Sequence, residues 1–533
     1  MTVPSFNLID QPWIPCLQAN GKVADISLRE LFAHAHELTD LAADSPMENA
    51  SLYRFLLAIL HHNFGPANSR QWQALWQAET LPFETINQYF ADPARYERFD
   101  LFSAKYPFGQ FTEDKRVNPK SIVSLKHGFG MLPNGWFNHQ VETEEKLEVR
   151  LSPSEAARDL LTVLSFGFGG LSGIPRVSHT DAICTKGVIF IIQGKNLKQT
   201  LVLNLIQYER DPFANNPDTP FWEMDDPLQD RSKPNGLLDQ YTFPSRGIKL
   251  YLDPKQLERG VLEVYQYRLG LGLRTDNIRD PMKHYYESKS SGLLPLTFDE
   301  DRQLWRNSSS LFELNLTGKV PPAIFNWLHM LIETNVLERQ NVFLCKAIGI
   351  AKNQGRADFA RQEQFPLPLS LLVAEKKLAQ LKDAIDRVER TNLVLGRALA
   401  LTSMHLHLDD PTKYNWEKKH ITHEGAEKDL GRIKTTEAQV QDWIICTGAE
   451  RHFWAALDVP FLQLMEKLGV ADNNDLISIK VWWHEKLREA AHNAFRQVLQ
   501  YTNQTPRAFK AFAHGNNRLQ GYLNKNFPQE KTA

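Results

Sequence analysis

The chain has few cysteines and no long apolar run. Its four cysteines are widely separated and include no CxxC pair, so neither a disulfide framework nor a sequence-local zinc knuckle is expected. No stretch approaches the roughly eighteen consecutive apolar residues of a transmembrane helix. The N-terminal segment MTVPSFNLIDQPW lacks the basic and apolar regions of a secretory signal. We therefore expect a cytoplasmic protein that does not enter a membrane.

The signatures of several enzyme classes are also missing. The sequence contains no GxSxG, no HExxH, and no GK[ST] after the glycine-dense segment Phe166–Gly173, FGFGGLSG. A phosphate-binding loop runs from a strand through glycines into a helix. Here the order is reversed, because a helical pattern ends near Leu164 and a strand pattern follows the glycines. We expect no nucleotide cofactor and no nuclease or helicase activity.

The net charge is close to zero, at −2. A free-standing DNA-binding protein usually carries a basic excess. The distribution is uneven, however, because from Tyr501 onward five lysines and arginines are opposed only by Glu530. If this chain handles DNA, it is best explained as one subunit of an assembly that supplies the remaining positive field.

At 533 residues the chain is too long for one hydrophobic core, so at least two domains are expected. Residues 1–370 mix short strands and helices. Ser27, Ser45 and Ser152 are predicted helix N-caps, the last two followed by proline in the first turn. Strand patterns cover Gly187–Gln193, Ile248–Leu252 and Leu262–Tyr267.

The pattern changes near residue 370. Leu378, Leu381, Ile385, Val388, Asn392 and Leu395 recur at alternating steps of three and four residues. Further helical patterns cover Thr436–Leu457, a stretch marked by Trp483, Leu487, Ala490, Ala494 and Val498, and Thr505–Phe527. The predicted fold class is α+β, with a large mixed α/β N-terminal domain (1–370) and a C-terminal four-helix bundle (371–533).

Two short segments are suited to contact with DNA. Gly167, Gly169, Gly170 and Gly173 occur within seven positions, and glycine allows a close backbone approach to a partner. IAKNQGR, residues Ile350–Arg356, places two amide side chains between cations. Amides can hydrogen bond to base edges, and cations neutralise phosphates. A plain helix-to-strand turn remains the alternative for the glycines.

Two other clusters leave alternatives open. His405, His407, His420 and His423 stand near Asp409, Asp410 and Glu424, a set that could bind zinc or manganese in a hydrolase, although solvated or helix-capping histidines are the favoured explanation. The segment Pro133–Gln140, PNGWFNHQ, begins with a turn signal and continues with an aromatic pair. That pair is either folded into the core or exposed as a platform for nucleic acid. A scaffold whose glycine segment binds only protein is a third hypothesis.

The chain resembles the CasA family, the large subunit of the type I-E CRISPR surveillance complex Cascade. Five motifs in the same order carry the resemblance: LIDQPWIPC (8–16), DSPMENASLYRFLLAILH (44–61), GFGG (167–170), NQG (353–355) and AERHFW (449–454). The resemblance implies a subunit without catalytic activity. Such a subunit is expected to read the motif adjacent to the target from the minor groove, to open the duplex for crRNA pairing, and to help recruit a helicase-nuclease.

The resemblance also implies roles for particular residues. Gly167, Phe168, Gly169 and Gly170 match the glycine loop that contacts the adjacent motif, and Arg268, with Arg274 second, is expected to be a minor-groove finger. Asn353, Gln354 and Gly355 match the wedge that separates the strands. Phe137, Asn138 and His139 correspond to a loop that docks near the crRNA 5′ handle. The implied partners are double-stranded target DNA, other Cascade subunits with crRNA, and the helicase-nuclease. No metal or other cofactor is implied.

Overall fold

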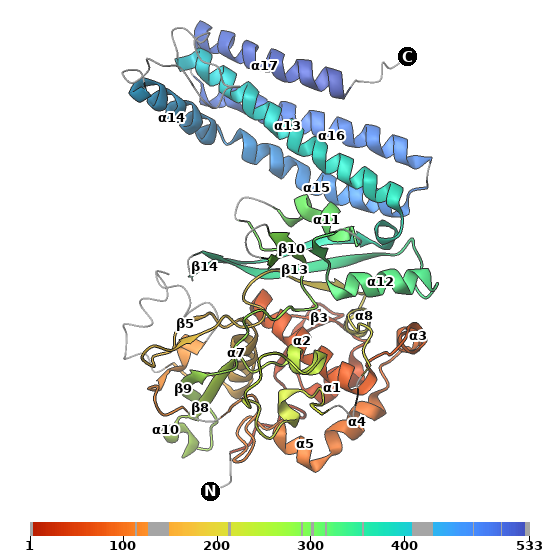
Figure 1. Ribbon diagram of the computed structural model, residues 1–533, viewed down its shortest axis with the longest axis vertical. Helices are drawn as coiled ribbons and strands as arrows, with labels where there is room; N and C mark the ends of the chain where they lie inside the picture. Colours follow the sequence, from red (N-terminus) through yellow and green to blue (C-terminus); the bar gives the residue numbers. More distant parts are fainter. Residues whose placement is uncertain are drawn as a thin grey trace. The chain divides into compact units, whose positions relative to one another are not determined.

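The computed structural model describes residues 4–111, 114–125, 149–209, 211, 215–288, 292–299, 303–314, 317–353, 356–407, 430–472, 474–502 and 504–527. The chain folds into two compact units. One contains Met1–Arg339 and Phe343–Phe365, and the other contains Gln340–Val342 and Pro366–Ala533. The first mixes strands and helices and the second is built mainly from long helices, which confirms the predicted α+β class (Figure 1).

A small antiparallel sheet opens the N-terminal unit. Its strand order is β2 (Val23–Ile26), β1 (Ile14–Gln18), β3 (Leu38–Leu41). The helix α1 (Leu28–His34) follows β2 directly. The Ser27 hydroxyl accepts from the Glu30 N–H while the Glu30 carboxylate accepts from the Ser27 N–H, so both form a capping box. The predicted helix start at Ser27 is confirmed.

Two long helices, α2 (Pro46–Phe64) and α7 (Pro153–Phe166), pack against each other within the N-terminal unit. Each begins with proline in its first turn, and the preceding Ser45 or Ser152 accepts a hydrogen bond from the backbone. Both predicted starts are therefore confirmed. Fourteen of the nineteen residues of α2 are buried, so this helix runs through the core instead of covering it.

Buried ion pairs tie distant segments to α2. Arg54 Nη1 lies 2.7 Å from Asp280 Oδ2, and both side chains are at most 2% exposed. Lys346 pairs with Asp40, which also accepts from the Tyr53 hydroxyl. Removing one partner of such a pair leaves a buried charge without compensation, at a cost of about 3–5 kcal/mol. These pairs therefore fix the chain around residues 40, 280 and 346 to one helix.

The remaining strands form small antiparallel arrangements. The sheet orders are β4-β9-β8, β5-β6, β14-β13-β7 and β11-β10-β12. Their bounds are β4 (Lys120–Ser121), β5 (Gly170–Leu171), β6 (Ser178–His179), β7 (Ile189–Gln193), β8 (Arg246–Leu252), β9 (Val264–Leu271), β10 (Tyr285–Ser288), β11 (Gly292–Pro295), β12 (Lys319–Val320), β13 (Val342–Asn353) and β14 (Arg356–Pro368). β7, β8 and β9 confirm the three strands predicted from the sequence.

Shorter helices complete the N-terminal unit. They are α3 (Ser69–Gln77), α4 (Phe83–Ala91), α5 (Pro93–Arg98), α8 (Leu197–Leu203), α9 (Leu237–Tyr241), α10 (Pro254–Leu257), α11 (Ser308–Phe312) and α12 (Ala323–Glu333). Among them, α9 packs on α2, and α8 packs on β3 and β7.

The second unit is a helical bundle. Its helices are α13 (Glu375–His407), α14 (Leu430–Thr447), α15 (Ala449–Val470), α16 (Asp475–Gln497) and α17 (Pro506–Asn526). α13 contacts each of the other four, and α15 also packs on α16. Leu381, Ile385, Val388 and Leu395 of the predicted seam are buried. No helix in the described ranges, in either unit, has the length and apolar character needed to cross a membrane.

The structure corrects the predicted helix Thr436–Leu457. Gly448 lies between α14 and α15 with φ = +61°, in the left-handed region that L side chains rarely adopt. The prediction of one continuous helix is therefore wrong at Gly448. One arm of the bundle consists of two successive helices, α14 and α15 (Figure 1).

Candidate nucleic-acid interface

The glycine segment begins where α7 ends. Gly167 caps the helix, and its N–H donates to the Val163 carbonyl over 2.9 Å. A Cβ on Gly167 would stand 2.6 Å from that same oxygen, so a side chain is excluded. The chain then enters β5, where Gly170 pairs with His179 of β6. The glycines therefore lead from a helix into a short hairpin, the order expected from the sequence.

The glycines of this segment have different structural tasks. The Gly169 N–H donates to Asp181 Oδ1 over 2.7 Å, and a Cβ there would lie 2.9 Å from the His179 carbonyl and from the Asp181 nitrogen. Gly169 is thus required by packing within the protein. Gly170 is exposed, has φ = +151°, and a Cβ would meet no atom within 4 Å. Of these two, Gly170 is the one that leaves room for a partner.

A buried arginine holds the inner side of the segment. Arg246, at the start of β8, is 1% exposed. Its Nη2 donates to the carbonyls of Gly167 (2.9 Å), Phe168 (2.8 Å) and Thr180 (2.8 Å). Burial lowers the pKa of Arg246 to about 10, partly offset by the negative charge of Asp181. A cation therefore lies directly beneath the glycine backbone.

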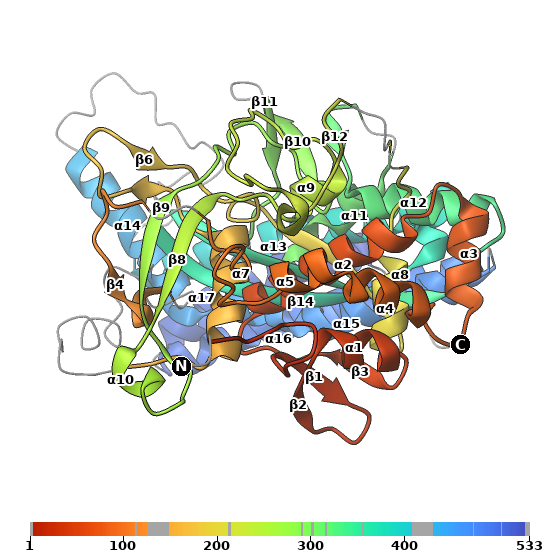
Figure 2. The same cartoon turned by 90° about the horizontal axis from the view of Figure 1, so that it is seen from below.

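Two other segments flank the hairpin. A Cβ on Gly173 would lie 3.7 Å from Val117 Cγ1, and the Thr275 N–H donates to Thr180 Oγ1 over 3.3 Å. In both views the β5–β6 hairpin and the β8–β9 pair lie on the same side of the N-terminal unit (Figures 1 and 2). Segments 114–121, 167–186 and 272–276 are thus neighbours.

These neighbours carry an excess of positive charge. Together with Arg246 they hold seven cations and three carboxylates, a formal net charge of +4 on a chain whose total is −2. Burial and the charges of Arg246 and Lys120 lower the pKa of His179 to about 4, so this histidine stays neutral at pH 7. The cations are Lys115, Arg116, Lys120, Arg176, Lys186, Arg246 and Arg274, and the carboxylates are Asp114, Asp181 and Asp276.

The two candidate minor-groove arginines occupy different places. Arg268 lies within β9 opposite Lys249, is half-buried, and its guanidinium is 5.8 Å from the centre of the Tyr251 ring. Arg274 lies in the loop after β9, is 71% exposed at its side chain, and pairs with Asp276 at 2.7 Å. Arg274 directly precedes Thr275, the residue bonded to the hairpin, so Arg274 is the one beside the glycine segment.

The predicted wedge lies at the end of a long ribbon. β13 ends at Asn353 and its neighbour β14 begins at Arg356, while β7 pairs with the other edge of β13. Gln354 and Gly355 lie outside the described residues. In Figure 1 the end of the ribbon nearest these positions extends toward the side that carries β5. Phe137, Asn138 and His139 of the predicted docking loop also lie outside the described ranges.

Comparison with known proteins decides the family. The family described as "CRISPR-associated protein Cse1" matches residues 7–499. A CasA/Cse1 protein of Thermus thermophilus is 29% identical to the chain, over 96% of each protein. This chain belongs to the Cse1 family. The family resemblance predicted from the sequence motifs is confirmed.

Solved structures share the whole Cse1 fold. The crystal structure of Thermobifida fusca Cse1 matches with a TM-score of 0.77 at 25% identity, covering 98% of both chains. A chain from a structure entitled "CRISPR RNA-guided surveillance complex" matches with a TM-score of 0.69, covering 97% of this chain and 100% of its own. The second match, at 19% identity, shows the fold alone.

The histidines of the alternative metal site in this Cse1 protein are only partly described. His405 and His407 lie in the last turn of α13, whereas Asp409, Asp410, His420, His423 and Glu424 fall outside the described ranges. The His405 ring stacks on His514 at 4.1 Å between centroids. In the part of the chain that the structure describes, no group of three or more His, Cys, Asp or Glu side chains could hold a metal ion.

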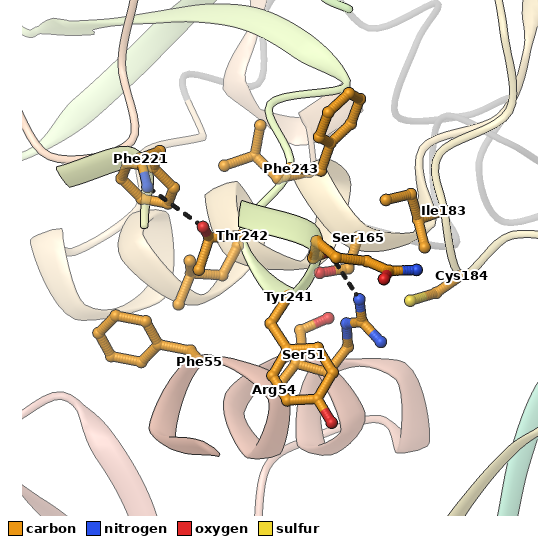
Figure 3. Close-up of a pocket in the computed structure, with 13 residues that line it drawn as sticks. Ser51, Arg54, Phe55, Ser165, Ile183, Cys184, Phe221, Tyr241, Thr242 and Phe243 are labelled. Atoms are coloured by element: carbon orange, nitrogen blue, oxygen red, sulfur yellow. Dashed lines mark hydrogen bonds between the residues drawn. The ribbon is translucent and has the colours of Figure 1, made fainter. Parts of the chain in front are cut away.

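A cavity behind the glycine segment is too small for a ligand. It measures about 20 Å³ and is lined by residues of α2, α7 and α9, including Arg54, and by Ile183 and Cys184 from the segment between β6 and β7 (Figure 3). Arg54 donates to the Gln240 carbonyl over 3.0 Å across it. Burial raises the pKa of the Cys184 thiol to about 11, so this cysteine is not a ready nucleophile. The space fits about one water molecule.

Proposed function

We propose that this Cse1 protein is the non-catalytic large subunit of a type I-E Cascade complex, located in the cytoplasm. In that role it recognises the protospacer-adjacent motif of target DNA from the minor groove and opens the duplex for crRNA pairing. It also helps recruit the helicase-nuclease. Family membership supports the role, as does the occurrence of the same fold in a CRISPR RNA-guided surveillance complex.

One observation carries the DNA-binding part of this proposal. The open backbone at Gly170 stands in a region of local net charge +4, on a chain that is otherwise negative. The minor groove presents few distinguishing groups, chiefly separating A·T from G·C pairs. An exposed glycine backbone with cations around it can enter such a groove and distinguish the adjacent base pairs with relaxed selectivity.

For the arginine finger we propose Arg274 ahead of Arg268. Because Arg274 adjoins the residue that bonds Thr180, it can reach the same groove as Gly170. Arg268 lies within β9, half-buried over Tyr251, and is the second candidate. The Arg274–Asp276 pair is largely exposed, so exchanging the carboxylate for a phosphate costs little.

The wedge acts through the ribbon that carries it. The strands that precede and follow the wedge positions, β13 and β14, are twelve and thirteen residues long, and β7 pairs with the other edge of β13. An amide inserted between base steps offsets part of the lost stacking through hydrogen bonds to exposed base edges. R-loop formation replaces a DNA duplex with an RNA–DNA duplex of similar stability. A small local contribution to strand separation is therefore enough to decide whether the R-loop forms.

The remaining assignments concern protein and RNA partners. Phe137, Asn138 and His139 are proposed to dock the subunit near the crRNA 5′ handle. The N-terminal domain (1–370) is proposed to carry motif recognition and duplex opening. The helical bundle (371–533), with its basic terminal helix, faces other Cascade subunits or the displaced strand.

A strand-opening assay tests the proposal. The complex is reconstituted with each variant and mixed with a set of duplexes that differ only in the adjacent motif and together include every motif sequence. A fluorescent base in each duplex reports strand opening. Gln354→Ala is expected to slow opening about tenfold or more, because the inserted amide no longer offsets unstacking. Gln77→Ala, an exposed glutamine at the end of α3, is the matched control and should open DNA normally.

Two results would overturn the proposal. One is wild-type opening that shows no dependence on the adjacent motif. The other is unchanged opening by both Gln354→Ala and Gly170→Ala in complexes that assemble normally, which would favour a purely structural scaffold.

A further inference from the structure

The side chain that follows the exposed glycine is an apolar residue in water. Leu171 is 96% exposed, the highest exposure among the large hydrophobic residues described. It lies in β5 opposite Ser178, directly after Gly170. A singly exposed leucine is ordinary on a protein surface. Leu171 is unusual because it stands at the open corner of a cationic surface.

The turn of the same hairpin carries a strained arginine. The Val177 N–H donates to the Ile174 carbonyl over 3.2 Å, closing a four-residue turn with Pro175 second and Arg176 third. Arg176 has φ = +64°, in the left-handed region where such turns favour glycine. A bulky non-glycine residue in this region indicates a strained backbone, and strain of this kind is concentrated at functional sites.

The turn is otherwise well built. The Ser172 hydroxyl donates to the Val177 carbonyl over 2.7 Å and accepts from the Ile174 N–H over 3.2 Å. These hydrogen bonds stabilise the turn at residues 172–177, which is the tip of the hairpin, although the positive φ is unfavourable for Arg176. Glycine would fit the same position without strain, so the sequence keeps a charge there at a conformational cost.

We infer that the hairpin tip is a two-part DNA contact, in which Leu171 packs into the minor groove and Arg176 binds a backbone phosphate beside it. This inference rests on the proposed function and extends it from the glycine backbone to two side chains. Apolar residues are the side chains that proteins press against or between base steps in the minor groove. Arginine supplies the phosphate contact that fixes the register of the protein on the duplex.

Salt dependence separates the two contacts. Binding of a motif-bearing duplex by the assembled complex is measured over a series of salt concentrations. Arg176→Gly is expected to weaken binding and to reduce the slope of log K against log[salt] by about 1, the value for one phosphate contact. Leu171→Ala is expected to weaken binding about tenfold with the slope unchanged, because an apolar contact releases no counterion.

The controls keep the inference testable. Arg176→Gly removes the strained residue, so the protein should fold at least as stably as the wild type. Met330→Ala shortens another exposed apolar side chain of the N-terminal unit, 48% exposed on α12, and should bind DNA normally. Wild-type binding that depends on the motif, measured in parallel, establishes the proposed function independently of both variants.

Three outcomes would overturn the inference while leaving the proposed function intact. The first is wild-type affinity in both tip variants. The second is an unchanged salt slope for Arg176→Gly together with undiminished DNA affinity of Leu171→Ala. The third is loss of Leu171→Ala protein from the assembled complex, which would show that the tip contacts another subunit instead of DNA.

Discussion

The guanidinium of Arg246 donates to the backbone carbonyl of Phe168 over 2.8 Å, from a position that is 1% exposed. The same nitrogen also bonds the carbonyls of Gly167 and Thr180. Because these carbonyls turn inward toward one buried cation, the backbone of the glycine segment is held before any partner arrives. Preorganisation of this kind lowers the entropy cost of binding.

Arg246 should therefore be important for stability. Arg246→Ala leaves three inward-facing carbonyls without their donor, and we expect a loss of about 2–4 kcal/mol in the free energy of unfolding. Arg246→Lys keeps a charge but cannot reproduce the planar set of donors, so its loss should be smaller but measurable. Urea denaturation checks both values.

An exposed arginine of the same surface provides the control. Arg116, whose side chain is 63% exposed, pairs with Asp114 at 2.8 Å, and Arg116→Ala should shift the unfolding midpoint far less than Arg246→Ala. Equal stability of Arg246→Ala and Arg116→Ala would contradict the inward orientation of the three carbonyls.

Gly170 should affect DNA binding beyond its cost to folding. Gly170→Ala meets no atom within 4 Å but is strained at φ = +151°, so a loss of about 1–3 kcal/mol is expected. Gly260→Ala is matched, with φ = +76° and the same open surroundings. Only Gly170→Ala should slow opening of a motif-bearing duplex in the reconstituted complex. If both variants opened DNA alike, Gly170 would have no role in recognition.

Local features of the fold could be predicted because they depend on neighbouring residues. Ser27 and Ser152 cap their helices through residues three positions away. Strand alternation and the α13 seam are likewise short-range. By contrast, Arg246 contacts Gly167 across 79 positions, and no motif around it signals that contact. The prediction of a continuous helix across Gly448 was wrong because amphipathic spacing does not reveal a single residue with a left-handed backbone.

In the candidate site, too, short-range features could be predicted from the sequence and long-range contacts could not. The glycine density predicted a close backbone approach to a partner, but it could not show which glycines are needed for packing within the protein. Gly169 is packed against residues 179–181 of the protein itself, whereas Gly170 faces open space. Only three-dimensional contacts distinguish a glycine needed for folding from one available to a ligand.

Acid should destabilise the N-terminal unit through His61. Burial lowers the pKa of His61 to about 4, and its Nδ1 lies 2.8 Å from the Leu57 carbonyl. Between pH 6.5 and 4 the unfolded chain binds a proton that the folded chain does not, so stability is lost as the pH falls. This one group contributes at most about 3 kcal/mol.

Comparison with His61→Gln isolates that contribution. Other histidines with lowered pKa values, such as His179, titrate in both proteins. The free energy of unfolding, measured by urea titration from pH 7.5 to 4, should therefore fall less steeply in His61→Gln than in the wild type. Parallel curves for the two proteins would show that His61 is accessible to protons in the folded state.

Two glycines of α17 should respond in opposite directions to the same substitution. A Cβ on Gly515 would lie 2.6 Å from the Ala398 carbonyl and 2.8 Å from the Phe495 ring, so α17 approaches α13 and α16 closely there. Gly515→Ala must push the helices apart, at a cost of about 1–3 kcal/mol. Gly521 meets no atom within 4 Å, and Gly521→Ala should stabilise the helix by about 0.5–1 kcal/mol. Thermal unfolding of both variants checks the signs. A gain in stability from Gly515→Ala would mean that the helices of the bundle are spaced more widely than this packing requires.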